Sequence, residues 1–186
     1  IPIGYFKDHQ EPTMKLLRIT TLAFIAFSIA FPVSATMIGL TGTIRDFKDS
    51  HPDFESTIAY DPGIVESQLG PDGKPVYAGQ AGNPTTHGQT AFDQWYRDVP
   101  GVNMSTDYTI NLDNTITADP SVYTFTDSSF FPIDNQLFGN QGRSHNYHFT
   151  FELHTDFTYS GGEVFSFTGD DDLWVFINDE LVIDLG

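Results

Sequence analysis

The chain has 186 residues, which is room for one ordinary domain and not for two. Residues 36–186 contain 5 basic and 23 acidic side chains, a net charge of −18, because Lys7, Asp8, Glu11, Lys15 and Arg18 all precede them. This charge repels phosphates and anionic surfaces, which excludes nucleic acid as a partner and membrane insertion of the mature chain, while the absence of cysteine excludes disulfides and thiol catalysis.

The first 35 residues are typical of segments that are removed from a secreted protein. Residues 1–13, "IPIGYFKDHQEPT", precede Met14 and are interpreted as an upstream leader that is not part of the fold. Residues 14–35 begin with Lys15 and Arg18, continue with an uncharged apolar stretch and end in "VSA", the pattern of a secretory signal peptide. The sequence therefore predicts a secreted or cell-surface protein whose mature part starts at Thr36.

The mature part is rich in short alternating runs of β-branched and aromatic residues, separated by Gly, Pro, Asn and Asp clusters. Strands are expected at 37–47, 108–119, 121–126, 146–159, 163–169, 173–179 and 180–185. A short helix is expected at 90–99, where Phe92, Trp95 and Tyr96 form one aromatic face. Trp95 and Tyr96 could stack on a sugar ring, although packing in the core is the more common role at this spacing. Trp174, inside a strand, is expected to pack or to donate one hydrogen bond.

The stretch from Tyr147 to Tyr159 alternates well enough to predict the two faces of its strand. Apolar side chains occupy one face and polar ones the other, which predicts one buried face and one solvated face. The apolar set is Tyr147, Phe149, Phe151 and Leu153, and the polar set is His148, Thr150, Glu152 and His154. His148 and His154 share a face and could bind a transition metal, although solvated polar positions are the more common explanation.

These patterns predict an all-β domain over 36–186, an antiparallel β-sandwich of the lectin-like jelly-roll type with long loops and one short helix. The long loops are expected at 61–90 and 127–146. Because the chain stops at "ELVIDLG", where a last strand would lack a partner, we expect the domain to be incomplete at its C-terminus.

The segment "FTGDDDLWVFIND" crowds Asp170, Asp171 and Asp172 into one tight turn between two strands. A turn accounts for one or two of these acids, and water and salt would screen their repulsion at a solvated surface. A bound cation is the alternative, since it stabilises adjacent carboxylates. Calcium takes six to eight oxygen ligands in a flexible arrangement, so an acidic loop suits it better than zinc or magnesium.

Four blocks of the sequence are characteristic: "LTGTIRDFKDSHPDFE", "FDQWYRDVPGVN", "FFPIDNQLFGN" and "HNYHFTFELHTDFTYSGGEVFSFTGDDDLWVFINDELVIDLG". Together they resemble the fibro-slime domain family, which is related to the protective-antigen-type β-sandwich carbohydrate-binding modules. The resemblance implies that the aspartate pair matching Asp170 and Asp171 holds a calcium ion that coordinates sugar hydroxyls. In the lectin relatives a second loop completes the site, and that loop follows the strand matching 181–185.

A second group of candidate ligand-binding residues lies in "FFPIDNQLFGN". Asp134, Asn135 and Asn140 offer oxygen atoms for a cation or for sugar hydroxyls, and the same residue types also shape loops without binding anything. No serine elbow, phosphate loop or metalloprotease motif is present, and carboxylate pairs arise by chance in so acidic a chain. We therefore expect no catalytic residues and no enzyme.

The leading hypothesis is a secreted, non-catalytic, calcium-assisted carbohydrate-binding or adhesion module of a bacterial cell surface. Its partner would be an extracellular glycan or a cell-surface polysaccharide. The alternative is a structural module of an extracellular matrix or surface layer that binds no sugar, and a third possibility is a module that accompanies a hydrolase domain encoded downstream. The sequence predicts no oligomeric state.

Overall fold

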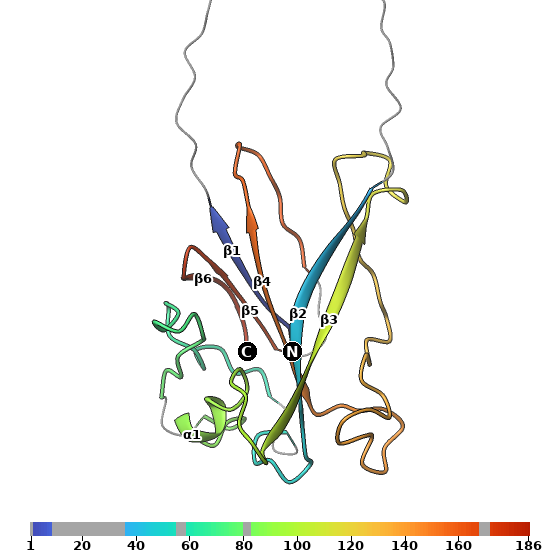
Figure 1. Cartoon of the computed structure of the whole chain (residues 1–186). Helices are drawn as coiled ribbons and strands as arrows, with labels where there is room; N and C mark the ends of the chain where they lie inside the picture. Colours follow the sequence, from blue (N-terminus) through green and yellow to red (C-terminus); the bar gives the residue numbers. More distant parts are fainter. Residues whose placement is uncertain (1, 9–35, 55–58, 80–82, 168–171) are drawn as a thin grey trace, which may run out of the picture.

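The computed structural model describes residues 2–8, 36–54, 59–79, 83–167 and 172–186. Its strands form one six-stranded sheet in the order β3-β2-β4-β1-β5-β6 (Figure 1). The elements are β1 (Pro2–Asp8), β2 (Met37–Phe47), α1 (Gln89–Phe92), β3 (Asn103–Asp113), β4 (Phe149–Phe157), β5 (Leu173–Ile177) and β6 (Glu180–Leu185). The predicted all-β fold with antiparallel strands is confirmed, whereas the helix expected at 90–99 is limited to Gln89–Phe92 and continues as turns.

β2 is the centre of the antiparallel half of the sheet. It pairs with β3 over its whole length, from Met37 opposite Asp113 to Phe47 opposite Asn103, and with β4 on its other side. Its bounds coincide with the predicted strand, because "MIGLTGTIRDF" alternates between residues that suit the two faces of a sheet. The Gly42 position brings β2 and the Phe151 ring of β4 into close contact.

β1 lies between β4 and β5 and runs parallel to both. Its residues pair from Pro2 opposite Phe151 to Asp8 opposite Phe157. The structure differs here from the expectation that residues 1–13 lie outside the fold. The physical reason is that "PIGYFKD" contains the strand-forming residues Ile3, Tyr5 and Phe6, and that β4 and β5 each offer it an edge with unpaired backbone groups.

Two apolar clusters cover the two faces of the sheet. Ile44, Phe149, Phe151 and Leu153 pack with Ile133, which belongs to the loop that precedes β4. The other cluster packs side chains of β5 against the segment between β2 and β3 and consists of Ile64, Val65, Phe92, Trp95, Tyr96, Trp174 and Phe176. In Figure 1 these two covering segments lie on either side of the lower part of the sheet.

The prediction that one face of β4 is solvated is wrong. His148, Thr150 and Glu152 are 2%, 0% and 3% exposed, and among the four predicted polar positions only His154 faces solvent. The segment between β2 and β3 covers this face, and the Thr150 hydroxyl donates a 2.6 Å hydrogen bond to the Trp95 carbonyl. On the apolar side the prediction holds within β4, whereas Tyr147 precedes the strand and is 48% exposed.

Other boundaries differ from those that the sequence predicts. β3 covers residues 103–113 instead of 108–119, and the predicted strand at 121–126 makes one isolated bridge, between Asp113 and Thr124. Residues 163–167 are not in a strand, and the remaining two residues of that prediction lie outside the described part. Since loops supply the layers on both faces of the described sheet, the jelly-roll arrangement stays a prediction.

Candidate functional site

The predicted calcium ligands directly precede β5 in the sequence. Asp170 and Asp171 are outside the described residues, as is the signal peptide predicted at 14–35. Asp172 is half-buried and immediately precedes Leu173, the first residue of β5. The structure therefore places one of the three acids and ties it directly to a strand.

β5 is a rigid support for that end of the chain. Four consecutive side chains, Leu173, Trp174, Val175 and Phe176, are at most 2% exposed. The Trp174 indole donates a 2.9 Å hydrogen bond from Nε1 to Asp184 Oδ1, across the pair that β5 and β6 form. Trp174 was expected to pack or to donate one hydrogen bond; it does both, and its hydrogen-bond partner ties the two strands together.

Two further acids lie at the same end of the β5–β6 hairpin. Asp184 pairs with Trp174, and its Oδ2 accepts a 2.9 Å hydrogen bond from the Gly63 backbone N–H. Asp61 donates its backbone N–H to the Gly186 carbonyl at 2.6 Å, and Gly186 follows Leu185, which pairs with Leu173, the residue after Asp172. We call Asp61, Asp172 and Asp184 the acidic end of the hairpin.

The carboxylates of Asp61 and Asp184 already have protein donors. Asp61 Oδ2 accepts a 2.8 Å hydrogen bond from the Thr85 hydroxyl, and both oxygens of Asp184 accept the bonds described above. Within the part of the chain that the structure describes, no three Asp, Glu, His or Cys side chains are grouped so that they could hold a metal ion. Asp61 and Asp184 thus add negative charge around the hairpin end while their oxygens hold loops in place.

Asp134, Asn135 and Asn140 come together in the loop before β4, as the sequence suggested, and their polar atoms are used within that loop. Asn140 Oδ1 accepts a 2.7 Å hydrogen bond from the Asn135 backbone N–H. Asp134 accepts bonds from the Asn146 backbone N–H at 2.7 Å and from His145 Nδ1 at 2.6 Å, which together lower the pKa of its carboxyl. These contacts fix the loop, and a binding role for the three residues stays a prediction.

Aromatic rings surround this loop at the surface. His145 stacks on Phe131 with 4.0 Å between ring centroids, and Tyr147 meets Phe131 edge-on at 5.2 Å. The Tyr147 hydroxyl is 2.8 Å from the Ser144 hydroxyl, and 48% of the residue is exposed. Exposed rings beside amide and carboxylate groups are the composition of many sugar-contacting surfaces, because the face of a sugar ring packs on an aromatic face.

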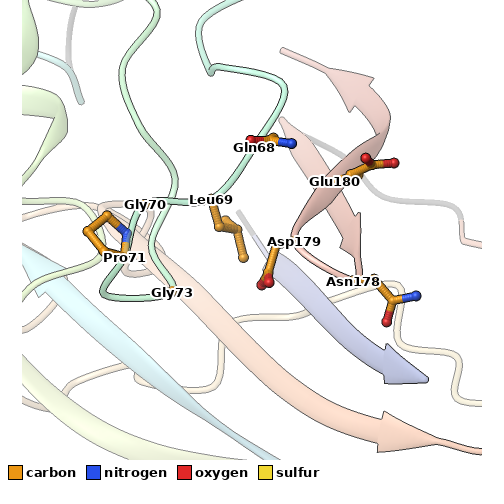
Figure 2. A pocket seen from close by; sticks show the side chains of 8 residues that line it. All are labelled: Gln68, Leu69, Gly70, Pro71, Gly73, Asn178, Asp179 and Glu180. Atoms are coloured by element: carbon orange, nitrogen blue, oxygen red, sulfur yellow. The ribbon is translucent and has the colours of Figure 1, made fainter. Parts of the chain in front are cut away.

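An open polar pocket of about 520 Å³ lies at the other end of the hairpin. Figure 2 shows Leu69 and Asp179 between the 68–73 loop and the β5–β6 turn, with Asn178 pointing away from the loop. The pocket is lined by Gln68, Leu69, Gly70, Pro71, Gly73, Asn178, Asp179 and Glu180. Since β5 separates Asn178 from Asp172, and a strand rises about 3.3 Å per residue, the pocket is separate from the acidic end.

A buried ionic network joins the sheet to the loop that lines this pocket. Glu152 accepts hydrogen bonds from Arg45 Nη1 at 2.7 Å, from His154 Nε2 at 2.6 Å and from the ammonium group of Lys74. Burial by itself raises the pKa of Glu152, but its bonds to His154 and Lys74 and the charges of Lys74 and Arg45 outweigh burial and lower the pKa to about 2. Glu152 is therefore ionised at neutral pH and anchors the loop through Lys74.

The histidines considered as transition-metal ligands have other partners. His148 is 2% exposed, and its ring lies edge-on to Phe54 at 6.4 Å. His154 donates from Nε2 to the Glu152 carboxylate at 2.6 Å, as described above. Trp95 and Tyr96, which were expected in the core, are 3% and 0% exposed, so that expectation is confirmed.

The residues missed from the sequence are Asp61 and Asp184. Asp184 lies in "ELVIDL" and Asp61 in the turn "DPG", and neither stretch differs from many other acidic positions of this chain. Their role depends on the register of β5 with β6 and on a contact between residues more than a hundred positions apart, Gly63 and Asp184. The sequence "DPG" indicates a turn at 61–63, but it does not indicate that this turn contacts Asp184.

Known proteins similar to this chain come from Dictyostelium discoideum. The chain is 38% identical to the protein psiR over 93% of its own length, and the match spans 19% of psiR. It is 39% identical to psiD over 92% of the chain and 36% identical to psiC over 93%, and each match spans 36% of the relative. The chain thus spans about a fifth to about a third of the length of these relatives.

No protein-family model matches the chain, and no solved structure matches it. None of the helices among the described residues is both long and apolar enough to cross a membrane.

Proposed function

We propose that the chain is a secreted, non-catalytic module that binds extracellular carbohydrate or mediates adhesion with the help of calcium. The single observation that carries the proposal is the acidic end of the hairpin, where Asp61 and Asp184 lie at the same end as Asp172, the residue that precedes β5. A negative field at this end favours a cation between the adjacent carboxylates of Asp170 and Asp171. The resemblance to fibro-slime domains and related lectin modules supports the same assignment.

The donor chemistry suits calcium. The residues that would hold the ion are Asp170, Asp171 and Asp172, which offer carboxylate and backbone carbonyl oxygens. When bound, calcium supplies a hard Lewis-acidic centre to which hydroxyl groups of a sugar can coordinate. The chain itself contributes the position of Asp172, which directly precedes the four buried side chains of β5.

The similar proteins support a modular role. Because the chain matches 19% of psiR and 36% of psiC and psiD, it corresponds to a part of longer proteins. These relatives belong to a eukaryote, so the proposal is an extracellular module in general and no longer a bacterial one. Extracellular glycan or cell-surface polysaccharide remains the proposed partner, and the high negative charge favours neutral or cationic sugars over anionic ones.

Calcium titration calorimetry of the full chain tests the metal. We expect a saturable binding heat for the wild-type protein and none for the Asp170→Asn, Asp171→Asn double variant. A matched control is the Asp119→Asn, Asp127→Asn double variant, which removes two negative charges at exposed positions of the segment after β3. Indistinguishable titrations of the wild-type protein and the Asp170, Asp171 variant would contradict the calcium assignment.

The second candidate is a structural module of an extracellular matrix that binds no sugar. The observation that favours it is the loop of Asp134, Asn135 and Asn140, whose oxygens hold each other and the loop in place. A glycan array with and without calcium separates the two functions. Calcium-dependent retention of a glycan supports carbohydrate binding, whereas the absence of retention under both conditions supports the structural role.

A further inference from the structure

The two edge strands of the sheet, β6 and β3, differ in how far other segments cover their outer sides. The β6 border is covered by the segment 67–69, because Leu181 donates its backbone N–H to Ser67 and Leu69 donates to Asp179, each at 2.9 Å. An isolated bridge between Gln68 and Glu180 adds to this contact. Among the described residues, backbone hydrogen bonds cover the β3 border only at the two ends of β3. Figure 1 shows β3 at the outer side of β2.

The ladder fixes which backbone groups of β3 point outward. Phe47 donates its N–H to the His148 carbonyl at 2.7 Å, so odd-numbered residues of β2 bond toward β4 and even-numbered ones bond toward β3. The register pairs Leu40 with Ile110 and continues without a shift, so the even-numbered residues of β3 bond β2. The odd-numbered residues of β3 therefore direct their N–H and C=O groups away from the sheet.

Contacts at both ends of β3 agree with this assignment. At one end Asp113 exchanges hydrogen bonds of 2.9 and 3.0 Å with Thr124, and at the other Asn103 donates to Val99 at 3.2 Å. Between them Ser105, Asp107, Thr109 and Asn111 are exposed, and no backbone hydrogen bond on the outer side is found for them in the described part of the chain. We call these four residues the open edge of β3.

The open edge lacks the features by which sheets usually prevent edge pairing. It contains no proline and no lysine, its register with β2 is continuous over 11 residues, and its only charged side chain is Asp107. A long regular edge of this kind presents a row of backbone donors and acceptors to another extended strand. The question is which strand complements it.

We propose that the open edge pairs with the open edge of a second copy of this chain, antiparallel and across a two-fold axis at Tyr108. In this register Ser105 faces Asn111 of the second copy and Asp107 faces Thr109. All four open residues then find partners, and each facing pair of outward-directed residues exchanges two hydrogen bonds. The pairing ends where Val99 and Thr124 already occupy the edge.

The side chains select this register over its neighbour. A pairing centred on Asp107 would place that carboxylate opposite itself, and like charges directly opposite are destabilising. Centred on Tyr108, each Asp107 faces the Thr109 hydroxyl, which is a hydrogen-bond donor. The net charge of −18 on residues 36–186 still opposes association of two copies, so the dimer should strengthen as salt increases.

Two substitutions at one position test the pairing. Thr109→Pro removes the outward N–H of residue 109 but leaves the hydrogen bonds between β3 and β2 intact. Thr109→Val keeps the outward N–H. Both variants lose the 2.8 Å contact of the Thr109 hydroxyl with Thr41. Sedimentation equilibrium of the full chain should show a concentration-dependent dimer for the wild-type protein and Thr109→Val, stronger at high salt. In Thr109→Pro the dissociation constant should rise at least about tenfold.

Cysteine cross-linking reports the register directly, since the chain has no cysteine of its own. Tyr108→Cys should form a disulfide-linked dimer under mild oxidation, because two residues at the axis are about 4.5 Å apart between Cα atoms. Met104→Cys, an exposed position on the same strand that faces residue 112 of the second copy, should stay monomeric under the same conditions.

Three outcomes would overturn the proposal: a wild-type protein that is monomeric at all concentrations, a Thr109→Pro variant that dimerises like Thr109→Val, or equal cross-linking at both cysteine positions. Circular dichroism of each variant establishes that it is folded. Should Thr109→Pro fail to fold, the cysteine pair still decides the question. The result is independent of the calcium titration, which concerns the acidic end of the hairpin.

Discussion

Arg45 on β2 and Glu152 on β4 form an ion pair that is almost completely buried. The hydrogen bond from Arg45 Nη1 to Glu152 Oε2 is 2.7 Å long, and the two side chains are 7% and 3% exposed. Arg45 also bonds Asp98 through Nε at 2.8 Å, and Lys74 adds a second cation on Glu152. This network links two strands of the sheet with the loops on both sides of α1: Lys74 contacts Glu152 directly, and Asp98 is joined through Arg45.

Glu152→Gln should destabilise the protein strongly. The amide preserves the shape of the side chain but removes the anion that Lys74 contacts and leaves the buried Arg45 with only the exposed Asp98 carboxylate. Removing one partner of a buried pair costs about 3–5 kcal/mol. Urea denaturation measures this loss in the free energy of unfolding. The exposed Glu180→Gln variant serves as control and should change stability by less than about 0.5 kcal/mol.

The contribution of Glu152 to stability should depend on pH in a defined direction. Its pKa is lowered from 4.5 to about 2 in the folded protein, so the folded state holds its proton less tightly than the unfolded state does. The stabilisation is fully present above pH 4.5 and is lost as the pH falls toward 2. Glu152→Gln lacks this dependence.

The difference in unfolding free energy between the wild-type protein and Glu152→Gln should therefore be constant from neutral pH to about 5 and then shrink as the pH falls. Taking the difference removes groups common to both proteins, among them Asp46, whose pKa burial raises. A difference that stays constant down to pH 2.5 would show that the contacts of Glu152 do not lower its pKa in the folded protein.

Local sequence patterns predict the position of a strand better than they predict which of its faces is buried. The β2 strand was predicted with its observed bounds because its alternation is regular along its whole length. The polar face of β4 was assigned to solvent because sequence alternation shows which residues share a face and not what covers that face. The covering segment contacts β4 through Thr150 and Trp95, residues 55 positions apart, and such contacts leave no local pattern.

The candidate site was predictable only where one stretch of sequence contains it. The three aspartates at 170–172 and the nearby Trp174 can be read directly from the sequence. Asp61 and Asp184 join that end only because β5 pairs with β6 and Gly63 donates to Asp184. Similarly, β1 takes its place through pairing with β4 and β5, whose edges are known only once the sheet is known.

The hydrogen bond between Trp174 and Asp184 should be worth a measurable part of the stability of the hairpin. Asp184→Ala removes the acceptor of a fully buried indole N–H and of the Gly63 N–H, and an unsatisfied buried donor costs about 1–3 kcal/mol. Asp184→Asn keeps one acceptor oxygen and should lose less. Equal loss in the two variants, measured by urea denaturation, would indicate that the charge of Asp184 matters more than its hydrogen bonds.

Gly42 on β2 should tolerate no side chain, because its neighbours leave no space for one. A Cβ atom there would lie 2.4 Å from the Glu152 carbonyl oxygen and 2.6 Å from the nearest Phe151 ring carbon. The carbonyl belongs to the β2–β4 ladder and the ring to the core, so neither can move without breaking other contacts. Overpacking of this kind costs about 1–3 kcal/mol, which we expect for Gly42→Ala.

Gly39→Ala is the matched control on the same strand. Its added Cβ would lie 3.3 Å from the Thr109 methyl carbon and 3.5 Å from Asn111 Oδ1, both side-chain atoms at an exposed part of the sheet. A small shift of these side chains relieves the contact, and replacing glycine lowers the entropy of the unfolded chain, so stability should change by less than about 1 kcal/mol. Thermal unfolding of the two variants side by side measures the contrast. Similar losses in both would mean that β2 is not held between β3 and β4 as closely as the contacts of Gly42 require.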